Sequence, residues 1–90
     1  MPSCQVTIIN KLGLHARAAA KFVSVANNYP CKISIGRDSN TLCNGKNIMS
    51  VMMLAASKGT ELHLNAEGEQ AEDALGALQK LIAERFDEEC

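Results

Sequence analysis

The apolar residues of this chain alternate between two spacings, one typical of strands and one typical of helices. Every second residue is apolar over residues 4–8, 31–35 and 62–66, a period that turns one face of a strand toward a core. Over residues 16–27 and 71–82, apolar residues recur every three or four positions, as on one face of a helix. A chain that switches repeatedly between these periods is expected to pack strands and helices in two layers.

Two shorter elements complete the predicted order. The turn "GRDSN" leads to a short strand near residues 41–43, and "NGKN" precedes a short helix at about residues 48–54. The order is then βαββαβα. This order favours an α+β open-faced β-sandwich, in which three helices cover one face of a four-stranded antiparallel sheet. The side chains expected on the uncovered face are polar: Gln5, Thr7, Lys32, Ser34, Glu61, His63 and Asn65.

Length and composition restrict the classes of partner. Ninety residues suffice for one core, so we expect residues 1–90 to form a single domain. The net charge is -1 and only 3% of residues are aromatic, whereas nucleic-acid-binding proteins usually show a basic face and often stacking aromatics. We therefore expect no nucleic-acid partner. No apolar run approaches the about 20 residues that span a membrane, so we expect no membrane insertion.

The cysteines, at positions 4, 31, 43 and 90, show neither a CxxC pair nor a zinc-like spacing with histidine. No metal site is therefore expected. The start "MPSCQVTII" lacks the basic and long apolar regions of a secretion signal. We expect a cytoplasmic protein with reduced thiols, in which Cys4, Cys31 and Cys43 are small core residues and Cys90 is exposed.

The stretch "NKLGLHARAAAKF" places His15 where the first long helix is expected to begin. The first amides of a helix lack intrahelical partners and bind phosphate-like anions. Histidine is not a preferred residue there, and Ser, Thr, Asp or Asn would stabilise the helix by about 1 kcal/mol. The amides of Ala16 and Arg17, with the Arg17 guanidinium, could hold a phosphoryl group on a nucleophilic imidazole. On these residues alone, an ordinary solvated helix start is the simpler interpretation.

The same stretch resembles the active-site segment of the HPr family, the small histidine phosphocarriers of the bacterial phosphotransferase system. The likeness continues through "GKNIMSVMMLAASKGTEL" and "AEGEQAEDALGALQKLI", so it covers essentially the whole chain. It implies that His15 accepts a phosphoryl group at Nδ1 from phosphorylated enzyme I, with Arg17 stabilising the phosphate. His15 would then pass the group to a histidine of an enzyme IIA domain.

The resemblance also implies the open-faced β-sandwich and a carrier that needs no cofactor of its own, although enzyme I requires Mg²⁺ to phosphorylate itself. Such a chain is a phosphoryl-carrying co-substrate of phosphotransferases rather than a turnover enzyme. We expect it to be a monomer.

Partner docking in the family uses the first and second helices together. The matching residues are Ala20, Lys21, Phe22, Lys46, Ile48, Met49 and Met52, with the two lysines at the rim. Methionines at an exposed patch suit a surface that must fit several partners. For Ile48 and Met49, a core position is an equally good interpretation. Val51 and Leu54 are expected to point inward.

Two positions depart from the commonest family pattern. Ala18 stands where a proline usually follows "HAR", and Asn47 stands where many relatives carry a serine that a dedicated kinase phosphorylates. Asparagine is a good N-cap but has no hydroxyl group. We therefore expect the second helix to form normally without regulatory phosphorylation at Asn47.

Two alternatives remain open at this point. A family member can serve sugar uptake or the nitrogen-related regulatory branch, and "MLAASKG" and "FDEEC" resemble the latter only weakly. A different class of function is a non-phosphorylated regulatory protein-binding module on the same fold. In that case His15 would be only a surface residue, and the presence of Arg17 beside it argues against this reading. His63 is expected to be an ordinary solvated side chain.

Overall fold

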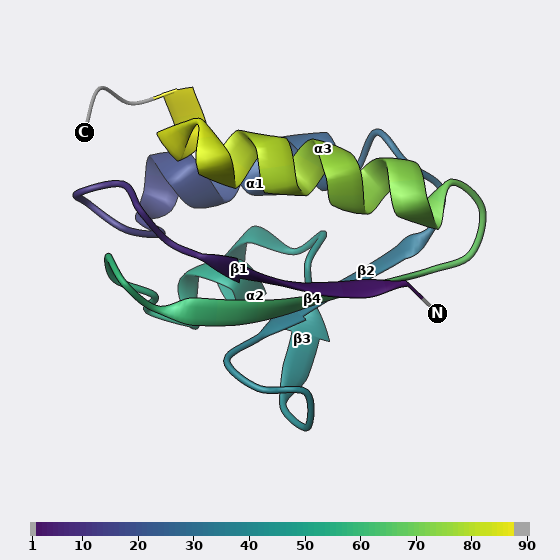
Figure 1. Cartoon of the computed structure of the whole chain (residues 1–90), viewed down its shortest axis with the longest axis horizontal. Coiled ribbons are helices and arrows are strands. Elements are labelled where there is room, and N and C mark those ends of the chain that lie inside the picture. The colour runs from purple at the N-terminus through teal and green to yellow at the C-terminus, as the bar shows by residue number, and fades with distance from the viewer. Residues whose placement is uncertain (1, 88–90) are drawn as a thin grey trace.

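The computed structural model describes residues 2–87 and has the element order that the sequence predicts, βαββαβα, followed by a short 3₁₀ segment (Figure 1). The elements are β1 (Ser3–Thr7), α1 (Ala16–Ala26), β2 (Lys32–Gly36), β3 (Leu42–Asn44), α2 (Ile48–Met52), β4 (Glu61–Glu67), α3 (Ala71–Ala83) and η1 (Arg85–Asp87). The short helix α2 ends earlier than the sequence pattern predicts, at Met52 instead of about Leu54.

The four strands form one antiparallel sheet in the order β1-β4-β2-β3. Its centre is β4, where Leu64 lies opposite Cys4 of β1 on one side and Ile35 of β2 on the other. Leu62, Leu64 and Ala66 are fully buried, whereas His63 and Asn65 between them are only partly buried. The period of two in the sequence therefore reports the two faces of this strand correctly.

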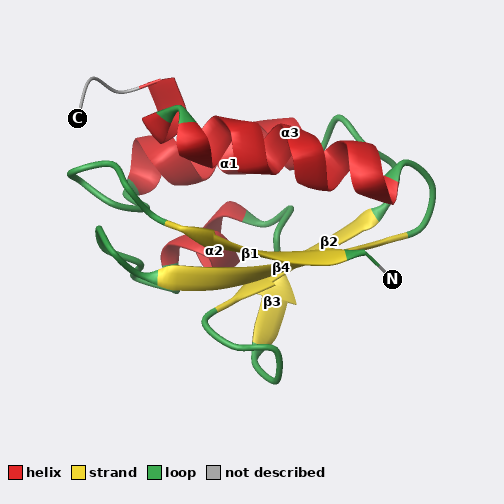
Figure 2. Ribbon diagram, viewed as in Figure 1, coloured by secondary structure: helices red, strands yellow, loops and turns green. Residues whose placement is uncertain are grey.

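Helices α1 and α3 cover one face of the sheet and leave the other uncovered (Figures 1 and 2). The short helix α2 contacts both α1 and β3, so it lies beside α1 at the β3 edge of the sheet. The apolar stripe of α3 is buried as predicted, and it consists of Ala71, Ala74, Leu75, Leu78, Leu81 and Ile82. The open-faced β-sandwich is confirmed.

The C-terminal end of the described chain turns back into the core, which the sequence pattern does not predict. Arg85, Phe86 and Asp87 all have positive φ angles, of 57°, 53° and 64°, and the Phe86 side chain is fully buried. Lys21 of α1 holds this turn, because its Nζ donates to the Phe86 carbonyl at 2.7 Å and lies 3.8 Å from the Asp87 carboxylate. The turn therefore ties the end of α3 to α1.

The cysteines are core or border residues, as predicted, with one refinement. Cys31 is buried, whereas Cys4 and Cys43 are half-buried and pack against the core. Burial raises the pKa of both half-buried thiols, which keeps them protonated. The Cys43 thiol donates to the carbonyls of Ile35 at 3.2 Å and Ser50 at 3.5 Å. Cys90 lies outside the described residues.

Candidate functional site

His15 is the N-cap of α1, as the sequence predicts. Its backbone is extended (φ -75°, ψ 179°), and its Nδ1 accepts a hydrogen bond from the Arg17 amide at 3.3 Å. The first intrahelical bond runs from the Ala19 amide to the His15 carbonyl at 2.8 Å. The imidazole therefore lies directly at the positive end of the helix.

The loop before His15 is fixed by close packing. Gly13 has φ +70°, and a Cβ at this position would lie 2.5 Å from the Ala56 carbonyl oxygen. The next amide, that of Leu14, donates to the same oxygen at 2.8 Å. The side chain of Asn10, which is fully buried, donates to the Gly13 carbonyl at 2.8 Å. Only glycine fits at position 13, and the loop it permits sets where His15 begins the helix.

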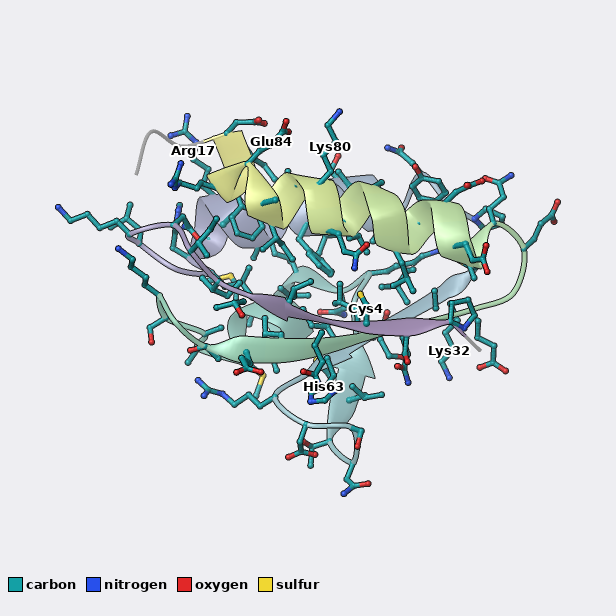
Figure 3. All side chains as sticks on the ribbon, viewed as in Figure 1. Cys4, Arg17, Lys32, His63, Lys80 and Glu84 are labelled. Atoms are coloured by element: carbon teal, nitrogen blue, oxygen red, sulfur yellow. The ribbon has the colours of Figure 1, made fainter. Side chains whose placement is uncertain are left out.

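The electrostatics at the start of α1 favour an anion. The first turn of α1 contains no acidic residue, so the helix itself brings no carboxylate next to the partial positive charge of its first amides. Ala16 and Arg17 are both exposed. Figure 3 shows Arg17 at the end of the molecule where Glu84 and the last turn of α3 also lie. A guanidinium group and the first amides of a helix near one imidazole form an arrangement suited to phosphate oxygens.

An exposed apolar surface lies on α2 and just beyond it. We call Ile48, Met49, Met52 and Met53 the methionine patch; these residues are 38%, 64%, 38% and 80% exposed. Helix α2 contacts α1, on which Ala20 is also exposed. Val51 points inward and is fully buried, as predicted, and Leu54 is partly buried. Ile48 and Met49, for which the sequence left core and surface equally open, therefore lie at the surface.

Phe22 does not belong to this surface. The resemblance placed Phe22 among the docking residues, but its side chain is fully buried in the core. The period of α1 explains the difference, because Phe22 lies on the same face as the buried residues Ala18, Ala19 and Ala26. The inclusion of Phe22 in a contact surface is therefore corrected. It supports that surface from below.

The two lysines predicted at the rim are both half-buried, and both donate to main-chain carbonyls. Lys21 holds the C-terminal turn, as described above. The Nζ of Lys46 donates to the Tyr29 carbonyl at 2.6 Å, just after the end of α1. Lys21 thus links α1 to the C-terminal turn, and Lys46 links the turn before α2 to the segment after α1.

Asn47 is the N-cap of α2. Its side-chain oxygen accepts a hydrogen bond from the Ser50 amide at 3.1 Å. This is the role that the sequence predicts for an asparagine at this position. The helix therefore starts on a side chain without a hydroxyl group.

The remaining histidine lies apart from this site. His63 is a partly buried residue of β4, opposite Gln5 of β1, and Figure 3 shows it on the other side of the sheet from Arg17. Within residues 2–87, no group of three His, Cys, Asp or Glu side chains could hold a metal ion. No helix in the same range is long and apolar enough to cross a membrane.

The contacts of one further side chain, that of Arg37, are not predicted from the sequence. Arg37 follows β2 and donates from Nε to the Leu54 carbonyl and from Nη2 to the Ala55 carbonyl, both at 3.0 Å. Its partners are main-chain atoms 17 and 18 residues away, so no local pattern of residue types could reveal them.

Comparison with known proteins agrees with this geometry. Residues 2–84 match the family model described as the PTS HPr component phosphorylation site. The chain is 64% identical over 88 residues to phosphocarrier protein HPr of Pseudomonas aeruginosa, covering 98% of each chain. It is 46% identical over 82 residues to the protein of the same name from Cupriavidus necator, covering 91% of each.

Solved structures agree as well. The crystal structure of HPr-C-His from Thermoanaerobacter tengcongensis is similar with a TM-score of 0.93 and 41% identity, over the whole of both chains. That of a phosphocarrier protein HPr from Bacillus anthracis is similar with a TM-score of 0.83 and 37% identity, covering 90% of this chain and 95% of the other. With its fold, its helix-capping histidine and these matches together, the chain belongs to the HPr family of bacterial phosphotransferase-system phosphocarriers.

Proposed function

We propose that His15 accepts a phosphoryl group at Nδ1 from phosphorylated enzyme I and passes it to a histidine of an enzyme IIA domain. In each transfer a nitrogen–phosphorus bond forms on the receiving ring and one breaks on the donating ring. The observation that carries the proposal is the bond from the Arg17 amide to His15 Nδ1 at the start of α1. It aims the lone pair of that nitrogen at the helix amides.

The same bond supports Nδ1 as the reactive nitrogen. An imidazole nitrogen that accepts a hydrogen bond carries the lone pair, so the proton of the neutral ring is on Nε2. At 3.3 Å the bond is longer than an ordinary N–H donor bond. Replacing it with charge-assisted bonds to phosphoryl oxygens therefore costs little.

The groups around Nδ1 supply what phosphoryl transfer needs. The reaction depends mainly on positioning and on the stabilisation of charge on the phosphoryl oxygens. The amides of Ala16 and Arg17 are the first of α1, and the Arg17 guanidinium adds a full positive charge. Arg17 is thus proposed to stabilise the phosphate on His15 and during its transfer.

The methionine patch, with Ala20 on α1, is proposed as the docking surface for enzyme I and for IIA domains. Its support is the exposure of large apolar side chains on a helix that contacts α1. Unbranched methionine side chains adapt to differently shaped partners, and a carrier must fit at least a donor and an acceptor. Lys21 and Lys46 form its charged rim.

At Asn47 we propose that regulation by serine phosphorylation is absent. Capping of α2 by the amide side chain supports this, since the helix start is complete without a hydroxyl group. The proposed location is the cytoplasm, where enzyme I and IIA domains are available to a carrier. We propose that it acts as a monomer without a cofactor of its own.

Intact mass spectrometry after mixing the protein with enzyme I, phosphoenolpyruvate and Mg²⁺ tests the proposal. We expect an acid-labile gain of roughly 80 Da, the mass of one phosphoryl group. The gain should disappear in His15→Ala and persist in the matched control His63→Ala, which removes the other histidine. A wild-type protein without the gain would instead favour the non-phosphorylated binding module.

A further inference from the structure

The chain leaving α2 is held from two sides through three consecutive carbonyl groups. We call residues 54–56 the exit segment. Arg37 donates to its first two carbonyls, those of Leu54 and Ala55, at 3.0 Å each. The Leu14 amide donates to the third, that of Ala56, at 2.8 Å. The exit segment therefore links the turn after β2 to the loop before His15.

The exit segment needs such support because its backbone is strained. Ala55 has φ +50°, a left-handed conformation that residues with a Cβ rarely adopt. Ala55 is also exposed, so no burial of its own side chain holds it in place. Strained backbone persists only where the surroundings determine it. Two of the bonds that do so come from one guanidinium group.

The other end of the exit segment contacts the His15 loop directly. Gly13 packs so closely against Ala56 that a Cβ would lie 2.5 Å from its carbonyl oxygen. Leu14, which bonds to that oxygen, immediately precedes His15. The exit segment is therefore in direct contact with the loop that precedes His15. At its beginning, the same segment follows Met53 of the methionine patch.

We propose that Arg37 is a positioning residue, which fixes the exit segment and thereby the placement of the methionine patch relative to His15. This inference rests on the proposed function, since the relative placement matters only if one partner covers both surfaces. Arg37 itself touches main-chain carbonyls and is not a catalytic residue. A planar guanidinium can donate to two neighbouring carbonyls from fixed directions, which a lysine ammonium cannot reproduce.

Hydrogen exchange at the Leu14 amide tests, without any partner protein, whether Arg37 fixes the exit segment. In Arg37→Ala the exit segment should open more often, so Leu14 exchange should become at least about tenfold faster. Amides at the centre of β4 should keep their wild-type rates. In Arg37→Lys the exchange rate of the Leu14 amide should lie between those of the wild type and Arg37→Ala, because the lysine can retain one of the two hydrogen bonds. Lys32→Ala removes a positive charge from the far end of β2, the strand that Arg37 follows. It is the matched control, and its Leu14 amide should exchange like that of the wild type.

The kinetics of phosphotransfer from enzyme I test whether Arg37 thereby sets the placement of the methionine patch relative to His15. Arg37→Ala should raise the KM for the carrier by about three- to tenfold while kcat stays within about twofold, because docking is loosened but the imidazole chemistry is unchanged. Arg37→Lys should recover part of the KM, and Lys32→Ala should leave it unchanged.

Three outcomes would overturn the role of Arg37. The first is an unchanged Leu14 exchange rate in Arg37→Ala. The second is faster Leu14 exchange with an unchanged KM. The third is uniformly faster exchange across the sheet, which would assign Arg37 to global stability alone. A wild-type protein that is never phosphorylated would refute the proposed function itself, and the Leu14 measurement keeps that failure distinct.

Discussion

The two helices that flank the proposed docking surface begin on different kinds of cap. Helix α1 begins on His15, whose Nδ1 accepts from the amide two residues on at 3.3 Å. Helix α2 begins on Asn47, whose Oδ1 accepts from the amide three residues on at 3.1 Å. Asparagine is among the best capping residues, and histidine is not. The cap of α2 therefore serves stability, and the cap of α1 places a nucleophilic nitrogen where helix amides can bind an anion.

His15→Asn gives α1 the same kind of cap as α2 and should produce the largest functional effect. The variant keeps a cap at the start of α1 but loses the nitrogen proposed to accept the phosphoryl group, so phosphorylation by enzyme I should be abolished. Its free energy of unfolding should rise by about 0.5 kcal/mol, because asparagine caps better than histidine. Urea denaturation and intact mass measure the two effects. A less stable variant would show that His15 contributes more to the helix than its long bond suggests.

Asn47→Ser changes the other cap, that of α2, to a residue that carries a hydroxyl group. Serine also caps helices well, so α2 should keep its start while gaining a hydroxyl group. In a His15→Ala background, HPr kinase with ATP should leave position 47 unmodified in the native sequence. The Asn47→Ser variant should gain one acid-stable phosphoryl group. A phosphoserine mapped to α2 in the background protein, at Ser50 for example, would contradict the proposed escape from kinase control.

Ala18→Pro should have the smallest effect. Ala18 lies in the first turn of α1, where proline is tolerated and restricts the unfolded chain. We expect the free energy of unfolding to change by less than about 1 kcal/mol and the rate of phosphotransfer to stay within about threefold. Stopped-flow transfer from enzyme I and urea denaturation measure both. A rate that changes by orders of magnitude would show that the free backbone at position 18 is part of the mechanism.

Much of the fold could be predicted from residue spacing, because the core selects side chains with a fixed period. The strand over residues 61–67 and the stripe of α3 match their predictions. The cap at His15 was predictable for a similar reason, since a helix start depends on neighbours in sequence. The spacing alone could not separate core from contact surface. Phe22 is buried, whereas the equally apolar Met49 is exposed.

The features that escaped prediction depend on contacts between distant residues. Phe86 is buried because three residues with positive φ turn it back toward Lys21, and no local pattern in the sequence indicates such a turn. Arg37 reads as an ordinary charged turn residue until its main-chain partners in the exit segment are known. The sequence thus located the histidine at the start of α1 more readily than the contacts that hold its surroundings.

The most direct test of the central claim is nuclear magnetic resonance of the ¹⁵N-labelled protein during phosphorylation by enzyme I. We predict nitrogen–phosphorus coupling at Nδ1 of His15. We also predict a large change in the Arg17 amide resonance, as this amide exchanges the imidazole for a phosphoryl oxygen. Coupling at Nε2, coupling at His63, or an Arg17 amide that does not respond would contradict these predictions.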